Sequence, residues 1–172
     1  GSTLRALSRR LPLPQNWTLI DNDSGLLTHA LASPRAENVA ATALPLDLNL
    51  SLEAALDRDV DLVATSALLD LVSSSWLDRL AIALAARGTS LYAALSYDGR
   101  IGFVPADPFD AAIVAAVNVH QLGNKGFGAA LGPAAAAFAI TRFEELGYSV
   151  KQGVSDWIIG TEDRDMQSEL LA

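Results

Sequence analysis

Asp21 is the residue of this chain whose position points most directly to chemistry. It ends the short apolar, β-prone run Trp17–Ile20 and stands 20 residues after Gly1. In nucleotide-binding α/β sheets, an acidic side chain at the carboxyl end of a strand, about 20 residues past a glycine turn, binds the ribose hydroxyls. Because Gly1–Leu11 reads as the entry into a helix, we interpret Gly1 as the last glycine of such a turn.

Polar residues follow other predicted strands in the same way. Four strands end at polar groups, which are Asp21, Asp47, Ser66–Asp70 and Ser96–Asp98. Ligands of open α/β sheets bind beyond the carboxyl ends of the strands. A single acid at such a position is more often a solvated turn or a helix cap. The repeated placement favours a binding site.

A second candidate constellation is the glycine-rich loop Gln121–Gly132. His120 precedes the loop, and Asn124, Lys125 and Phe127 lie within it. Glycines let a loop backbone approach a ligand or move as a lid. On this interpretation the four side chains form one wall of a ligand pocket, with His120 as a general base. The alternative is a histidine stabilised by the helix dipole at a helix end, followed by an irregular loop.

Short apolar runs alternate with longer helical patterns along the chain. Strands are predicted at 17–20, 38–44, 60–65, 90–95, 148–153 and 155–160, and helices at 24–32, 50–56, 75–87, 108–121, 133–146 and from 166. This alternation is typical of an α/β domain. We therefore expect residues 1–172 to form one doubly wound domain. Its sheet would be mostly parallel, with helices on both faces and an antiparallel terminal strand.

The helix predicted at 75–87 has the clearest pattern. Its apolar positions share one face, Gly88 lies beyond its end, and Ser74 or Ser75 can cap its start. Trp76 is predicted to lie in the core. Trp157 is predicted to pack in the core or on a sheet face.

Composition excludes several classes of function. Hydrophobic residues make up 51% of the 172 and charged residues 19%, which is typical of a globular domain. The net charge of −8, with no basic run longer than Arg9–Arg10, argues against binding to nucleic-acid backbones or anionic membranes. Without cysteine and with two histidines, we predict no metal site. We expect a soluble, cytoplasmic protein, because neither a signal peptide nor an apolar span is found.

The order of these features resembles that of the class I S-adenosylmethionine-dependent methyltransferases, which have a Rossmann-like fold. In that family a glycine-rich turn follows the first strand, and an acid after the second strand holds the ribose. An Asp after the third strand faces the adenine, and the loop after the fourth borders methionine and substrate. The resemblance implies S-adenosylmethionine as cofactor, bound by Gly1, Asp21, Asn22, Asp47, Leu48 and Ser66. It implies that the acceptor is bound by Asp70, Asn124, Lys125 and Phe127.

The resemblance leaves the first strand, the first glycines and the usual last strand unmatched, so we expect a domain that is incomplete at both ends. A parallel sheet without its first strand has a gap between the strands predicted at 17–20 and 60–65. Backbone groups facing that gap would be unpaired, which buried structure does not tolerate. We therefore expect chain preceding Gly1, or another segment, to fill the gap.

The function implied is methyl transfer from S-adenosylmethionine to a small or modest-sized acceptor. An NAD(P)-dependent oxidoreductase is the alternative, because a ribose-binding acid serves both classes. Neither Tyr92 nor Tyr97 has a lysine at helical spacing, since the only lysines are Lys125 and Lys151. This argues against a Tyr–Lys hydride-transfer site. A non-catalytic domain that keeps the methyltransferase fold is the third possibility.

Overall fold

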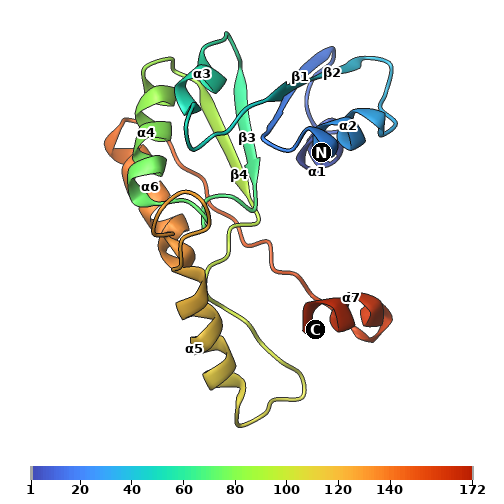
Figure 1. The fold of residues 1–172 in the computed structure, drawn as a ribbon, viewed down its shortest axis with the longest axis vertical. Helices are drawn as coiled ribbons and strands as arrows, with labels where there is room; N and C mark the ends of the chain where they lie inside the picture. Colours follow the sequence, from blue (N-terminus) through green and yellow to red (C-terminus); the bar gives the residue numbers. More distant parts are fainter. Residues whose placement is uncertain (1, 172) are drawn as a thin grey trace.

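The computed structural model describes residues 2–171, which alternate between strands and helices (Figure 1). The strands are β1 (Gln15–Asp21), β2 (Val39–Pro45), β3 (Leu62–Ser66) and β4 (Ser90–Ala94). The α-helices are α1 (Ser2–Leu7), α2 (Ser24–Ala32), α3 (Leu52–Leu56), α4 (Ser74–Ala85), α5 (Asp110–Gln121), α6 (Ala135–Glu145) and α7 (Arg164–Leu171). Two 3-10 turns, η1 (Gly132–Ala134) and η2 (Thr161–Asp163), precede α6 and α7.

The strands form two short parallel sheets. β1 pairs with β2 from Gln15↔Val39 to Asp21↔Pro45, and β3 pairs with β4 from Leu62↔Ser90 to Ser66↔Ala94. With helices on both sides, this confirms the predicted α/β class. β1 and β3, the strands on either side of the predicted gap, are not paired with each other. Within residues 2–171, each of them has one edge without a neighbouring strand.

The prediction of terminal strands at 148–153 and 155–160 was wrong, because no strand forms between residues 148 and 160. The strands that do form make two separate pairs and not one continuous sheet. A strand needs a neighbour for its backbone groups, and β4 pairs only with β3 in the described chain. Trp157 is 62% exposed, so its predicted packing was also wrong.

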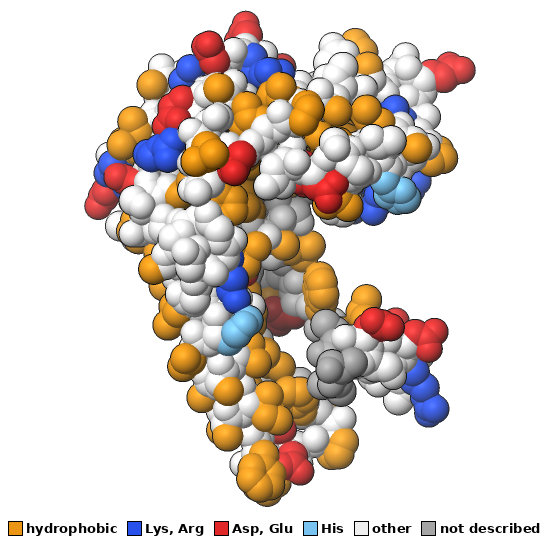
Figure 2. All heavy atoms as spheres, viewed as in Figure 1, with side chains coloured by type: hydrophobic (Ala, Val, Ile, Leu, Met, Phe, Trp, Pro, Cys, Tyr) orange, Lys and Arg blue, Asp and Glu red, His pale blue; other side chains and the backbone are white. Residues whose placement is uncertain are grey.

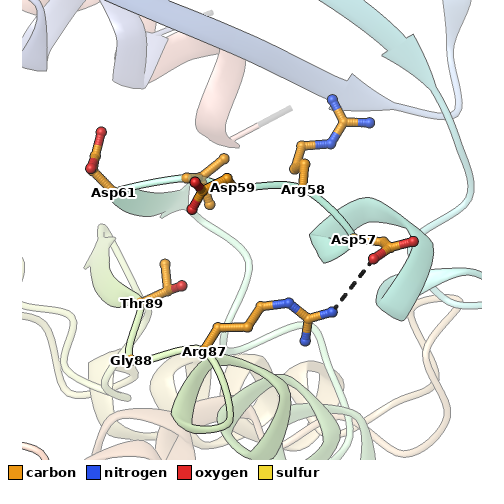
Figure 3. A pocket seen from close by; sticks show the side chains of 8 residues that line it. Asp57, Arg58, Asp59, Asp61, Arg87, Gly88 and Thr89 are labelled. Atoms are coloured by element: carbon orange, nitrogen blue, oxygen red, sulfur yellow. Dashed lines mark ion pairs between the residues drawn. The ribbon is translucent and has the colours of Figure 1, made fainter.

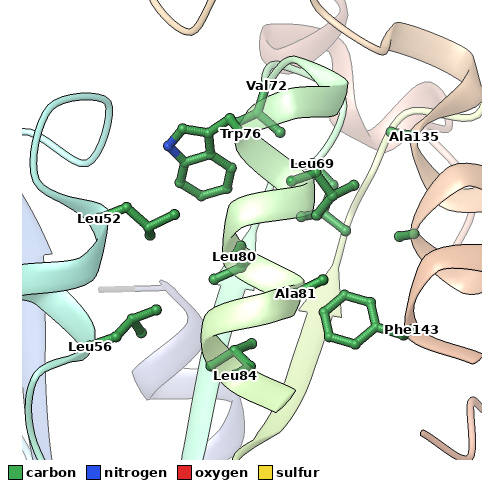
Figure 4. Close-up of a cluster of buried hydrophobic side chains, with 12 residues drawn as sticks. Leu52, Leu56, Leu69, Val72, Trp76, Leu80, Ala81, Leu84, Ala135 and Phe143 are labelled. Carbon is green, nitrogen blue, oxygen red and sulfur yellow. The ribbon is translucent and has the colours of Figure 1, made fainter. Parts of the chain in front are cut away.

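Helix α4 is the centre of the main hydrophobic core. The Ser73 hydroxyl accepts a hydrogen bond from the Trp76 amide at 3.3 Å, so the cap lies one residue before the predicted serines. The predicted apolar face is buried against α3 on one side and α6 on the other (Figure 4), and consists of Leu77, Leu80, Ala81 and Leu84. Burying one leucine side chain fully contributes about 1.5–3 kcal/mol. This helix therefore holds its half of the molecule together.

Ion pairs on the surface link the same three helices. Arg79 on α4 donates to Glu53 on α3 at 2.7 Å, and Arg142 on α6 pairs with Asp78 on α4. The hydrogen bond from Arg79 lowers the pKa of Glu53. Exposed pairs of this kind contribute little to stability. They align helices whose association is due to the apolar core.

The structure exposes much more surface than a compact domain of its mass. The accessible area is 11337 Å². A compact monomer of 18.1 kDa would expose about 8,100 Å². The excess lies over half-exposed strands and over helices that stand away from the core (Figures 1 and 2). In the described part of the chain, no helix has both the length and the apolar character needed to cross a membrane.

The hydrophobic core predicts that alanine substitutions at two nearby positions of α4 change the free energy of unfolding by very different amounts. Leu84 is fully buried, whereas Ile82 is 48% exposed. Leu84→Ala should lower the free energy of unfolding by about 2–5 kcal/mol, because it removes buried methyl groups and leaves a cavity. Ile82→Ala, the matched control, should lower it by less than about 1 kcal/mol. Urea denaturation followed by circular dichroism measures both, and equal losses would contradict the assigned core.

Candidate functional site

The carboxyl ends of β1 and β2 bring two of the predicted acids to one sheet edge. Asp21 stands opposite Pro45 in the ladder, and its carbonyl accepts a hydrogen bond from the Leu46 amide at 2.9 Å. Asp47 is the next residue in the turn that leaves β2. The parallel register therefore sets the two acids at the ends of adjacent strands.

Local hydrogen bonds orient both carboxylates. Oδ1 of Asp21 accepts from the amide of Asp23 at 2.9 Å, and Oδ1 of Asp47 accepts from the amide of Asn49 at 2.8 Å. Asp21 and Asp47 are half-buried, and Asn22, which lies between Asp21 and Asp23, is exposed. Asp23 in turn caps α2 by accepting from two amides of its first turn. These turns hold each acid beside the sheet edge.

Trp76 joins the turn after β2 to the glycine-rich loop. Its indole Nε1 donates to the carbonyl of Leu48 at 2.9 Å. On another side, the ring packs edge-on against Phe127, with 5.4 Å between centroids and 74° between planes. Phe127 also forms a parallel bridge with Val72. Leu48 and Phe127, predicted for cofactor and acceptor respectively, are therefore joined through one side chain.

Asn124 shapes the glycine-rich loop from within. Its Oδ1 accepts from the amides of Gly126 at 2.8 Å and Gly128 at 3.2 Å. Both glycines have positive φ, at 102° and 87°, which disfavours other residues there. The packing of Phe127 and the hydrogen bonds of Asn124 are structural contacts, whatever else these residues bind.

His120 and Lys125 lie together at the carboxyl end of α5. The Lys125 Nζ is 3.3 Å from His120 Nδ1 and 3.4 Å from Nε2. The His120 ring is exposed, and Lys125 is half-buried. The loop therefore brings the ammonium group of Lys125 next to His120, the predicted general base.

Asp70 is the most unusual polar residue near the end of β3. It is 5% exposed, and within residues 2–171 its Oδ1 is buried and has no hydrogen-bond partner. Its backbone carbonyl accepts from Gly132 at 3.0 Å, which ties it to the end of the glycine-rich loop. The Thr65 hydroxyl, next to half-buried Ser66, is likewise buried and has no hydrogen-bond partner in the described part of the chain. Buried polar atoms are nearly always hydrogen-bonded, so this pair calls for an explanation.

Two residues at this edge have a strained backbone that sequence reasoning did not anticipate. Ala67 and Leu95 adopt positive φ, 51° and 55°. They follow Ser66 and Ala94, which are paired in the ladder, and so lie at matching positions beyond β3 and β4. Left-handed backbone costs a non-glycine residue about 1–2 kcal/mol, and such strain clusters at functional sites. Alanine and leucine give no sequence signal of it.

The segment after β4 is tied to α5 and to the chain near residue 156. The Tyr97 hydroxyl donates to Asn118 at 2.7 Å, and burial raises the pKa of Tyr97. Arg100 donates to Asp98 at 2.6 Å and to Asp156 at 2.9 Å. The hydrogen bond from the Arg100 side chain lowers the pKa of Asp98. The Tyr97 hydrogen bond therefore attaches the carboxyl-terminal half of α5 to this segment, and Arg100 links the segment to Asp156.

A hollow lies away from these residues, beside the amino ends of β3 and β4 (Figure 3). It has a volume of about 590 Å³ and a polar lining, made by Asp57, Arg58, Asp59, Val60, Asp61, Arg87, Gly88 and Thr89. Arg87 and Asp57 are 3.9 Å apart. Among residues 2–171, no three acidic or histidine side chains converge as metal ligands would. The hollow contains none of the predicted site residues.

Gly1, the predicted last glycine of the cofactor turn, lies outside the described residues. Comparison of the chain with protein-family models, with curated proteins and with solved structures gives no match. The strand ends and the contacts around Trp76 are therefore the features from which a function can be inferred.

The strained position after β3 gives a testable prediction. Ala67→Gly should raise the free energy of unfolding by up to about 1 kcal/mol, because glycine adopts positive φ without a Cβ clash. Ala64→Gly, the same change at regular backbone within β3, should lower it by about 0.5–1 kcal/mol. Thermal and urea unfolding of both variants measure the difference. A loss of stability in both would contradict the left-handed conformation of Ala67.

Proposed function

We propose that this chain forms part of a class I S-adenosylmethionine-dependent methyltransferase domain acting on a small or modest-sized acceptor. The observation that carries the proposal is the placement of Asp21 and Asp47 at the carboxyl ends of two adjacent parallel strands. That edge is where open α/β sheets bind nucleotides. The strained backbone at Ala67 and Leu95, beyond the neighbouring strand pair, supports a site on the same side of the strands.

The residues of this edge fit the parts of the proposed cofactor. A half-buried carboxylate such as Asp21 can accept hydrogen bonds from both ribose hydroxyls. Asp47 and Leu48 offer a polar and an apolar contact for the adenine. Ser66, the last residue of β3, offers a hydroxyl at the carboxyl end of the neighbouring strand pair.

In methyl transfer the main task of the protein is to position the methyl donor and the acceptor relative to each other. When bound, S-adenosylmethionine supplies a methyl group on a sulfonium, and the electrons of the broken bond stay on sulfur as the acceptor takes the methyl. In-line displacement of this kind is accelerated by holding the reacting groups in line. Asp70 and the glycine-rich loop would orient the acceptor. His120 would take the proton that a hydroxyl or amine acceptor loses.

The open edges of β1 and β3 are consistent with the same fold. A parallel strand hydrogen-bonded to both would join the two sheets in the order β2, β1, added strand, β3, β4. It would also pair backbone groups that otherwise face no strand in the described chain. Under this proposal, the added strand carries the first half of the glycine-rich turn.

The proposal predicts that the full-length protein binds S-adenosylhomocysteine, the demethylated product. A hydrogen bond to a charged group contributes about 1.5–3 kcal/mol, so Asp21→Ala should weaken binding roughly 10- to 100-fold. Asp59→Ala, which removes an exposed acid at the opposite end of β3, should leave the affinity unchanged. Isothermal titration calorimetry measures all three proteins. Binding of NAD in place of the sulfonium compound would support the oxidoreductase alternative instead.

The same titration distinguishes the cofactor-binding role proposed for Asp21 from the general-base role proposed for His120. His120→Ala should bind S-adenosylhomocysteine with wild-type affinity, because a base that acts on the acceptor does not contact the cofactor. Once an acceptor is known, the variant should show reduced turnover. A large loss of cofactor affinity in His120→Ala would contradict the assignment of this residue to the acceptor side.

A further inference from the structure

Residues 151–171, which we call the arm, are set apart from the rest of the molecule. Every residue from 151 to 158 is exposed, and α7 packs on its own preceding turn η2. The Gln167 side chain donates to the carbonyls of Ile159 at 3.3 Å and Gly160 at 2.8 Å, which joins α7 to the chain that leads into it. In Figure 1 the arm leaves the region beyond β4 and ends in α7, which stands apart from both sheets. The position of the arm therefore depends on the few contacts that attach it.

Two contacts at opposite ends of β4 hold the chain that forms the start of the arm. The Tyr148 hydroxyl donates to the Thr89 carbonyl at 2.8 Å, beside the amino end of β4. This hydrogen bond is partly buried, and Val150, two residues further on, packs against the main hydrophobic core. Beyond the carboxyl end of β4, the Arg100 guanidinium donates to Asp156 at 2.9 Å. The chain therefore passes along β4 between one contact at Tyr148 and a second at Asp156.

The contact at Asp156 is the weaker of the two. The Arg100 side chain is 62% exposed and that of Asp156 is 56% exposed. Exposed ion pairs contribute little, because water and salt screen the two charges. Among residues 2–171, this pair is also the only hydrogen bond or ion pair that joins the arm to the rest of the molecule. The arm can therefore detach at Asp156 while Tyr148 keeps its place.

Asp98 orients the Arg100 side chain for its contact with the arm. The Oδ2 of Asp98 accepts from Arg100 Nε at 2.6 Å, and its Oδ1 accepts from the Arg100 amide at 3.1 Å. A guanidinium has separate donors, so Nη2 is left to bind Asp156. The Tyr97 hydroxyl, bound to Asn118, fixes the same segment to α5. A side chain that is ordered in advance loses less entropy when it binds. Asp156 therefore meets a cation that is already held in position.

We propose that the arm is a flap and that the Asp98–Arg100 pair is the latch that holds it beyond the carboxyl end of β4. When Arg100 releases Asp156, the arm moves away about the exposed residues 151–155, while Tyr148 stays anchored. In the latched state Trp157, the neighbour of Asp156, is kept on the side of the strands where open α/β sheets bind ligands. The latch therefore controls access to that side. The proposal is independent of methyl transfer, because it uses none of the residues assigned to the cofactor or the acceptor.

Double electron–electron resonance between two spin labels measures the position of the arm, because the chain has no native cysteine to interfere with labelling. Ile158→Cys on the arm and Ile82→Cys on α4 are both at exposed positions. In this labelled full-length protein, the latched arm should be the main population. Arg100→Gln should lower the ratio of latched to released arm about two- to fivefold, the contribution of an exposed ion pair. Arg79→Gln, the matched control, breaks the exposed pair with Glu53 and should leave the ratio unchanged.

Charge reversal and salt test whether the ion pair itself is the latch. Asp156→Asn removes the arm's side of the pair without changing the segment after β4, and it should release the arm as Arg100→Gln does. The double variant Arg100→Asp, Asp156→Arg keeps one cation between two carboxylates and should restore the latched population. At 1 M salt, where the screening length is about 3 Å, the parent should release the arm and Arg100→Gln should change no further. A distance distribution that neither Arg100→Gln nor Asp156→Asn alters, or a parent in which the released arm already predominates, would overturn the proposal.

Discussion

The packing of Trp76 is the contact on which the arrangement of the candidate site depends. The Ser73 hydroxyl accepts from the backbone amide of Trp76, while the indole donates to the Leu48 carbonyl and packs against the Phe127 ring. These contacts bring together the turn after β2, the start of α4 and the glycine-rich loop, which are far apart in sequence. Because Trp76 is 3% exposed, the hydrogen bond and the ring contact are shielded from water. The apolar face of α4 then determines where Trp76 lies.

The sequence was enough to predict what local patterns determine. The face formed by Leu77 and Leu84 recurs at helical spacing, and the β-branched runs at β1 and β3 are short, apolar and followed by polar residues. Asp21 and Asp47 could be assigned to one edge because parallel strands end on the same side. Such inferences need only periodicity and the topology of a parallel sheet.

What could not be predicted depends on contacts between distant segments. The runs at 148–153 and 155–160 have strand-like composition, but a strand exists only with a neighbour, and local propensity does not supply one. Trp157 is exposed for the same reason. The left-handed backbone of Ala67 and the buried Oδ1 of Asp70, which has no partner among the described residues, arise where the chain leaves β3 and meets the glycine-rich loop. An alanine in the sequence does not indicate a left-handed backbone, and an aspartate does not indicate a buried carboxylate oxygen.

The departures from ordinary local rules are not spread evenly over the fold. Helix α4 is capped, amphipathic and closely packed. The residues that line the charged hollow at the amino ends of β3 and β4 include no non-glycine residue with positive φ and no buried side-chain atom that lacks a hydrogen-bond partner. Within residues 2–171, the non-glycine residues with positive φ and the buried side-chain oxygens without a partner occur at or just beyond the carboxyl ends of β3 and β4. Natural sequences keep such costs mainly where function requires them. The distribution of strain therefore argues for the carboxyl side as the working side of the sheets, independently of any resemblance.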